Sequence, residues 1–193
     1  MNSQAPAHAP EASDLTLAIA VPKPSEYAPY YARYISLVEG NDAIQALELQ
    51  GPETVAMLSG LSDRQGGYRY APEKWSLKEV LGHVTDAERV FAYRALRIAR
   101  NDATPLAGFE QDDYVRAANF PNRPLAGLVE EFAAVRQASV LLFRSLDAEA
   151  WMRRGVANRN EVSVRAIAYI IAGHELHHRK IIQAKYLNTA GGP

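Results

Sequence analysis

The stretch GHELHHRKII, residues 173–182, holds three of the five histidines in the chain. His174 and His178 are four positions apart, so on a helix they lie one turn apart on the same side and can bind one metal ion. With Glu175 they also match the HExxH pattern of zinc peptidases, in which the glutamate is the general base. The stretch therefore predicts metal chemistry, by a peptidase or by another kind of centre.

A third ligand decides between these two interpretations. After His178 the chain reads RKIIQAKYLNTAGGP, which contains no His, Asp or Glu, so the third ligand must come from upstream. Outside the first residues of the chain, His83 is the other histidine that is available. Three neutral imidazoles from His83, His174 and His178 would hold a divalent ion and leave positions open for water or substrate, as in catalytic sites. The alternative is that these histidines are ordinary side chains at a helix edge.

Apolar residues at spacings of three and four predict four long helices that would position these histidines. In the last of them, His174 and His178 fall within the apolar stripe, and in the second His83 lies beside it. Ser76 and Glu79 have the spacing of a capping box at the start of the second helix. No alternating pattern of useful length predicts a strand. The helices are expected at residues 42–61, with a kink or break at Gly51-Pro52, at 76–101, at 125–146, and from 163 to before 191.

Four amphipathic helices favour an all-α four-helix bundle, in which sites are built from inward side chains on facing helices. A short helix or turn is expected around residues 27–37, before the first long helix. The connection at residues 101–123 is too long for a tight turn, and segments of that length are typical of functional covers or crossovers. It carries Phe109, Tyr114 and Phe120.

Two carboxylates near the apolar stripes need partners. Glu175 and Glu88 would each require an arginine or a hydrogen-bond role if buried, and either an ion pair or a catalytic role is compatible with that position. Asp86 lies one turn from His83 and could orient its imidazole, or could be a solvated surface carboxylate. The catalytic candidates are thus Glu175 and Asp86. The candidate arginine partners are Arg94, Arg97, Arg136 and Arg165.

Composition narrows the classes of function. The chain of 193 residues is long enough for one domain and contains no cysteine, which excludes disulfides, thiolate metal sites and cysteine nucleophiles. Its 21 basic and 22 acidic residues give a net charge of −1 with no basic cluster, so nucleic acid is not an expected partner. Residues 1–24 are expected to be a flexible tail before a single domain at 25–193. The tail has neither a secretion signal nor a membrane anchor, which favours a cytoplasmic protein.

Residues 25–188 resemble the DinB-like (DinB/YfiT) superfamily. The resemblance rests on KWSLKEVLGHVTDAERVFAYRALRIAR, PLAGFEQDDY and VSVRAIAYIIAGHELHHRKII. It implies a bundle of up-down-down-up topology with a long connection between its second and third helices, commonly a homodimer. It also implies zinc or nickel bound by His83, His174 and His178. Relatives in that family include transferases that use low-molecular-weight thiols such as bacillithiol or mycothiol.

Three hypotheses of function follow. The first is a metal-dependent enzyme acting on a small molecule, either a thiol S-transferase or a hydrolase. The second is a non-enzymatic, stress-related, metal-binding dimeric module, in which Glu175 or His177 would close the site as a fourth ligand. The third, with the least support, is an HExxH zinc peptidase.

Overall fold

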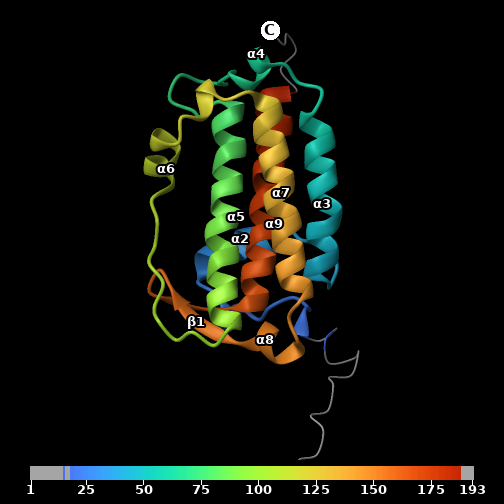
Figure 1. Ribbon diagram of the computed structural model, residues 1–193, viewed down its shortest axis with the longest axis vertical. Coiled ribbons are helices and arrows are strands. Elements are labelled where there is room, and N and C mark those ends of the chain that lie inside the picture. The colour runs from blue at the N-terminus through green and yellow to red at the C-terminus, as the bar shows by residue number, and fades with distance from the viewer. Residues whose placement is uncertain (1–14, 16–17, 188–193) are drawn as a thin grey trace, which may run out of the picture.

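Four long helices form the body of the protein in the computed structural model, which describes residue 15 and residues 18–187. The helices run side by side along the longest axis of the molecule (Figure 1). The predicted all-α four-helix bundle is confirmed. The long helices are α3 Ala43–Leu58, α5 Leu77–Ala99, α7 Leu125–Arg144 and α9 Val164–Ile182.

Contacts of the short helix α4 (Asp63–Gly66) show at which end of the bundle α5 and α7 begin. The Asp63 carboxylate lies 2.9 Å from the Lys78 ammonium in the first turn of α5 and accepts a 2.7 Å hydrogen bond from the Leu125 amide at the start of α7. α5 and α7 therefore begin at the same end of the bundle and run parallel, whereas α3 and α9 run the other way (Figure 1). α5 packs against α7 and α9, and α3 packs against the same two helices. This is the up-down-down-up topology that the resemblance implies.

The helices begin where capping residues stand in the sequence. The Glu79 amide donates to the Ser76 hydroxyl and the Ser76 amide donates to the Glu79 carboxylate, which confirms the predicted capping box. Asp42 accepts hydrogen bonds from two amides in the first turn of α3, and Ser163 accepts one in the first turn of α9. These caps satisfy amides that have no partner within their own helix, and so they fix where the ligand-bearing helices start.

Pro52 lies inside α3 without breaking it. A break at Gly51-Pro52 was one of the two outcomes expected from the sequence, because proline lacks the amide hydrogen that the helix needs at that position. α3 nevertheless continues as one helix from Ala43 to Leu58. Leu47 and Leu58, on either side of Pro52, are both fully buried, and their packing offsets the lost hydrogen bond.

A two-stranded hairpin stands where no strand was expected. Strands β1 (Arg154–Ala157) and β2 (Asn160–Ser163) pair antiparallel directly before α9. The turn residues Asn158 and Arg159 both have positive φ angles, 49° and 65°, which suits the tight turn of a hairpin. The sequence signal was weak because the strands are short and arginine is not a usual residue in such a turn.

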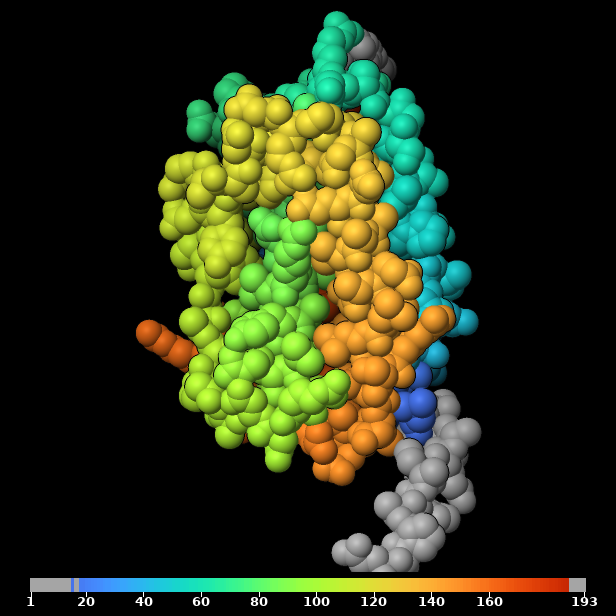
Figure 2. Space-filling view, viewed as in Figure 1, coloured from blue at the N-terminus to red at the C-terminus, as the bar shows by residue number. Residues whose placement is uncertain are grey.

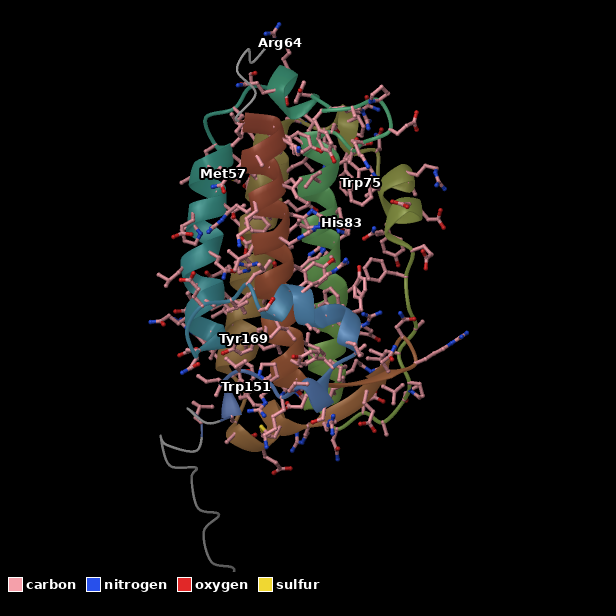
Figure 3. The ribbon with its side chains drawn as sticks, turned by 180° about the vertical axis from the view of Figure 1, so that it is seen from behind. Met57, Arg64, Trp75, His83, Trp151 and Tyr169 are labelled. Atoms are coloured by element: carbon pink, nitrogen blue, oxygen red, sulfur yellow. The ribbon has the colours of Figure 1, made fainter. Side chains whose placement is uncertain are left out.

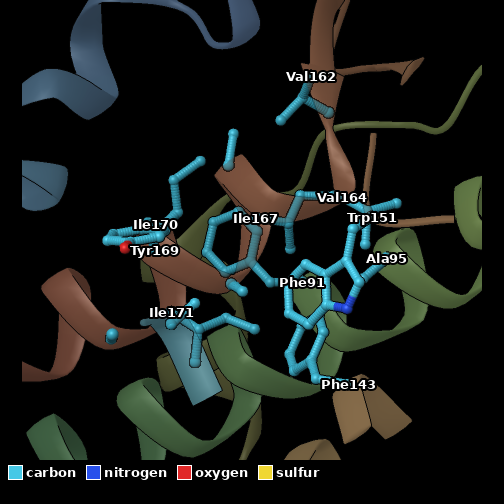
Figure 4. Packing of buried hydrophobic residues seen from close by; sticks show 14 of the residues in the cluster. Phe91, Ala95, Phe143, Trp151, Val162, Val164, Ile167, Tyr169, Ile170 and Ile171 are labelled. Atoms are coloured by element: carbon cyan, nitrogen blue, oxygen red, sulfur yellow. The ribbon is translucent and has the colours of Figure 1, made fainter. Parts of the chain in front are cut away.

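Two apolar clusters fill the bundle, one towards each end. In the first, the rings of Phe143 and Trp151 stack with centroids 5.3 Å apart (Figure 4). The second surrounds Phe132 and includes Phe120, which comes from the long connection. The two clusters bury both ends of the same four helices, and they leave buried polar residues between them that matter for the site.

The predicted long connection between α5 and α7 is confirmed, and it is partly helical. It contains α6 (Gln111–Ala117) and the 3₁₀ turn η3 (Phe120–Asn122). In the space-filling view it runs along the side of α5 towards the opposite end of the bundle (Figure 2). Leu106 in this connection pairs with Ala157 of β1 through a parallel bridge, which ties the connection to the hairpin.

The remaining elements are short. Residues 27–37, expected to hold a short helix or turn, contain the 3₁₀ turn η2 (Pro29–Tyr31) and α2 (Ala32–Ile35), which packs across α9. The others are η1 (Pro24–Glu26), α8 (Ala148–Met152) and the π-helical turn η4 (Gln183–Leu187).

Two of the predictions from the sequence concern the ends of the chain. Much of the predicted tail, residues 1–24, lies outside the described residues, and so does the predicted end of the last helix. In the described part of that tail, Ala18 and Ile19 are buried against the first apolar cluster. None of the helices within residues 18–187 has the length and hydropathy needed to cross a membrane.

Candidate metal centre

Three histidine side chains from two helices meet inside the bundle. His83 comes from α5, and His174 and His178 come from α9. Nε2 of His174 lies 3.1 Å from Nε2 of His83 and 3.2 Å from Nε2 of His178. One ring nitrogen from each histidine lies within 4.8 Å of the other two. Two nitrogens bound tetrahedrally at about 2.0–2.1 Å from one ion lie roughly 3.3 Å apart. The cluster therefore fits a divalent metal ion.

Burial keeps the three imidazoles neutral, which is the state that binds metal. Only 3% of His83 and 7% of His174 is exposed. Burial lowers the pKa of His83 to about 4, although the nearby charge of Asp112 acts in the opposite direction. Burial also lowers the pKa of His178 to about 3, and it holds the pKa of His174 well below its usual value. At neutral pH all three rings can therefore offer a nitrogen lone pair.

Aromatic rings hold the histidine rings in place. The Trp75 ring lies against His83 with centroids 4.9 Å apart, and the two side chains stand together in the view from behind (Figure 3). The Tyr34 ring of α2 meets His174 edge-on at 5.3 Å. The backbone of Tyr34 approaches α9 so closely that a β-carbon on Gly173 would lie 2.1 Å from the Tyr34 carbonyl oxygen. The glycine before His174 is thus required for this contact.

A buried layer of ion pairs lies beside the cluster, and it shows which residues pair with Glu175 and Glu88. Arg136 of α7 donates hydrogen bonds of 2.9 and 2.8 Å to the Glu88 carboxylate and lies 2.5 Å from the Glu175 carboxylate. Thr54 of α3 donates a 2.6 Å hydrogen bond to Glu175. Burial alone would lower the pKa of Arg136, but the two carboxylates raise it above its usual value. Residues of all four long helices meet in this layer.

The other candidate arginines are engaged elsewhere. Arg94 donates to the carbonyl oxygen of Ala107 at 2.7 Å. Arg97 pairs with Asp102, and Arg165 pairs with Glu26 at 2.5 Å. Of the four arginines predicted as partners of Glu88 and Glu175, Arg136 is therefore the one that pairs with both.

Asp86 and His177 lie outside the histidine cluster. The Asp86 carboxylate accepts a 3.1 Å hydrogen bond from Arg89 and none from the His83 imidazole, so of the two roles predicted for Asp86 the structure does not support the orientation of His83. The His177 ring packs edge-on against Tyr34 at 5.3 Å. Neither His177 nor Glu175 belongs to the group of ring and carboxylate atoms within 4.8 Å of one another, so neither closes the cluster as a fourth ligand.

Two cavities reach the histidine cluster. The first has a volume of about 380 Å³, and His83 and His174 form part of its wall. The second, of about 340 Å³, reaches His178 and is also lined by Trp75 and Tyr186. The first is rich in aromatic rings and is also lined by three residues with side-chain amides. The aromatic residues are Tyr30, Tyr31, Tyr34, Phe91 and Phe109, and the amide residues are Gln111, Asn158 and Asn160.

Asp112 lines both cavities, although it is not among the site residues predicted from the sequence. It lies in α6, within the connection that was expected to be a functional cover. The acidic run Gln111-Asp112-Asp113 in that connection was the available signal, but nothing in the sequence shows which of the two aspartates faces the histidines.

The arrangement suits catalysis better than a purely structural metal site. Three imidazoles leave at least one coordination position free, and both cavities adjoin the cluster. It does not suit an HExxH peptidase, because Glu175 is buried against Arg136 and Thr54 and lines neither cavity. The motif's glutamate thus stabilises the bundle, while its two histidines supply two of the three converging ring nitrogens.

Comparison with known proteins places the chain in a family. Residues 46–182, more than half of the chain, match the family model of the DinB superfamily. YfiT from Bacillus subtilis, described as a probable metal-dependent hydrolase with an unusual four-helix bundle topology, has a similar structure with a TM-score of 0.67. The two share 13% identity over 84% of this chain and 91% of YfiT, so this likeness shows the fold. No curated protein matches the chain. The chain belongs to the DinB superfamily.

Proposed function

We propose that this protein is a metal-dependent hydrolase of a small molecule, with zinc or nickel held by His83, His174 and His178. The observation that carries the proposal is the convergence of three ring nitrogens beside two cavities, from the buried His83 and His174 and the half-buried His178. A divalent ion at that point would lower the pKa of a water molecule and polarise a carbonyl group of the substrate. The description of YfiT as a probable metal-dependent hydrolase supports the same class of reaction.

The residues of the chain would bind and orient the substrate. The aromatic wall around Tyr31, Phe91 and Phe109 would take up the apolar part of the molecule and exclude water from the reacting group. Asn158 and Asn160 of the hairpin line the same cavity, and their amides can donate and accept hydrogen bonds. The hairpin would therefore contribute to substrate recognition.

Hydrolysis by protein that has been stripped with a chelator and then reloaded with zinc or nickel tests this proposal. The substrates should be neutral esters, amides and lactones small enough for a cavity of about 380 Å³. We expect chelation to abolish hydrolysis, one of the two metals to restore it, and His178→Ala to prevent restoration. His177→Ala is the matched control and should retain activity. Hydrolysis that survives both chelation and His178→Ala would overturn the proposal.

Thiol transfer is the second candidate, and the second cavity favours it. Two cavities that reach one metal centre could hold two reactants, a low-molecular-weight thiol and an electrophile. The chain has no cysteine, so the thiol would have to come from a small molecule, and a metal ion would stabilise its thiolate. Metal-dependent consumption of glutathione, bacillithiol or mycothiol with a model electrophile would favour transfer over hydrolysis. The homodimer and the cytoplasmic location remain predictions.

A further inference from the structure

Asp112 is a carboxylate without a partner beside the histidine cluster. Within residues 18–187, no side chain or backbone group forms a hydrogen bond or an ion pair with it. The next residue, Asp113, pairs with Arg116 at 2.7 Å on the exposed side of α6. Asp112 instead lines both cavities, beside His83 and His174 in one and beside His178 in the other. It therefore borders all three predicted metal ligands.

Packing of α6 holds Asp112 in this place. Val115, three residues later and on the same face of the helix, is 4% exposed and belongs to the second apolar cluster. Asp112, Asp113 and Arg116 are exposed, so Asp112 lines the cavities at a position that solvent can reach. α6 packs on α5, and Asp112 and His83 line the same cavity.

We propose that Asp112 determines which ligands bind at the open position of the metal centre, because its negative charge disfavours anions relative to neutral molecules. The inference rests on the proposed metal centre and adds the class of ligand to it. Asp112 is not among the residues whose ligand atoms lie within 4.8 Å of one another, so it is assigned to the ligand and not to the metal. It is a specificity-determining residue under this proposal.

Charge gives the direction of the effect. A carboxylate on the cavity wall disfavours a second negative charge nearby, whereas a neutral ligand is affected little. Salt screens such an effect when one of the charges is exposed, as Asp112 is. At low ionic strength we expect removal of this charge to tighten the binding of a monoanion by about fivefold.

Titration of the cobalt-loaded protein with azide and with imidazole tests the proposal, because both bind to cobalt and change its visible spectrum. Azide carries a negative charge and imidazole is neutral at pH 8. In Asp112→Asn, which keeps the size of the side chain, the azide Kd should fall about fivefold and the imidazole Kd should stay within about twofold. Asp113→Asn is the matched control and should leave both Kd values unchanged. In 0.5 M salt the azide difference should shrink.

An unchanged azide Kd in Asp112→Asn would overturn the proposal, as would an equal change in Asp113→Asn. Cobalt content and circular dichroism of each variant establish that its fold and metal centre are intact. Wild-type protein that binds no cobalt would instead contradict the proposed metal centre, and this inference would fall with it. Bound cobalt with an azide Kd that does not respond to Asp112 would refute this inference alone.

Discussion

Nε2 of His83 lies 3.1 Å from Nε2 of His174, although the two residues are 91 positions apart in the chain. The contact exists because α5 and α9 are antiparallel neighbours, so that a residue early in α5 faces one late in α9. Two neutral imidazoles that approach so closely, with a third at 3.2 Å, form a preorganised set of nitrogen ligands. The stability of this part of the bundle and its metal binding should therefore depend on the same contacts.

Arg136→Met should destabilise the protein strongly. The substitution leaves the Glu88 and Glu175 carboxylates buried without a positive charge, and breaking a buried pair in this way costs about 3–5 kcal/mol. The free energy of unfolding, measured with a chemical denaturant, checks this prediction.

Arg144→Met, on the same helix, is the control. Arg144 pairs with Glu48 but its side chain is 55% exposed, so its loss should cost less than about 1 kcal/mol. Similar losses in the two variants would contradict the role given to the buried layer.

Gly173→Ala should lower both stability and metal affinity. The added methyl group would lie 2.1 Å from the Tyr34 carbonyl oxygen, so α2 or α9 has to move, at a cost of about 1–3 kcal/mol. Movement of α2 would also withdraw the Tyr34 ring from His174. Thermal unfolding and zinc titration measure the two effects.

Gly127→Ala gives the comparison. Gly127 lies in α7 with open space around its Cα, so alanine there should be neutral or stabilising by up to about 1 kcal/mol. A Gly173→Ala protein that matched it in stability and zinc affinity would refute the close contact.

The metal-free protein should lose stability as the pH falls from 6.5 to about 4. The folded state keeps His83 and His178 neutral down to their lowered pKa values of about 4 and about 3, whereas the unfolded chain protonates histidine near 6.5. In that interval the unfolded chain binds more protons, so each imidazole costs up to about 1.4 kcal/mol per pH unit. Denaturant unfolding at several pH values measures the slope, and His83→Gln should reduce it. An unchanged slope in that variant would contradict the burial of the neutral ring.

Nickel binding should quench the fluorescence of Trp75. Its ring lies 4.9 Å from the His83 ring, whereas Trp151 lies in the other apolar cluster. A paramagnetic ion quenches an indole at short range, so Trp75→Phe should remove the nickel-dependent change and Trp151→Phe should keep it. Quenching that persists in Trp75→Phe would place the metal elsewhere.

Local signals in the sequence predicted the long helices well. The Ser76–Glu79 capping box and the apolar stripes act within one helix, and helices appeared where these patterns stood. The hairpin around Asn158-Arg159 was missed because its strands are short and it is held by packing against α5 and the long connection. Of the two outcomes predicted for Gly51-Pro52, a kink or a break, the break is absent from α3, because burial on both sides of Pro52 cannot be read from propensity.

Ligand chemistry and helical periodicity were enough to predict the three histidines of the site, but not the residues around them. The spacing of His174 and His178 placed both on one face, and elimination of other ligands pointed to His83. The choice of Arg136 over three other arginines depends on which helices are neighbours. So does the approach of Asp112, because the long connection has no periodic pattern that fixes its path. These contacts are set by tertiary structure.

Metal content of protein purified without an affinity tag tests the central claim most directly. We predict about one divalent ion per chain in the wild type and in His177→Ala, and almost none in His83→Ala and His178→Ala. Circular dichroism of the four proteins shows whether each is folded. Equal metal content in all four folded proteins would contradict the three-histidine centre.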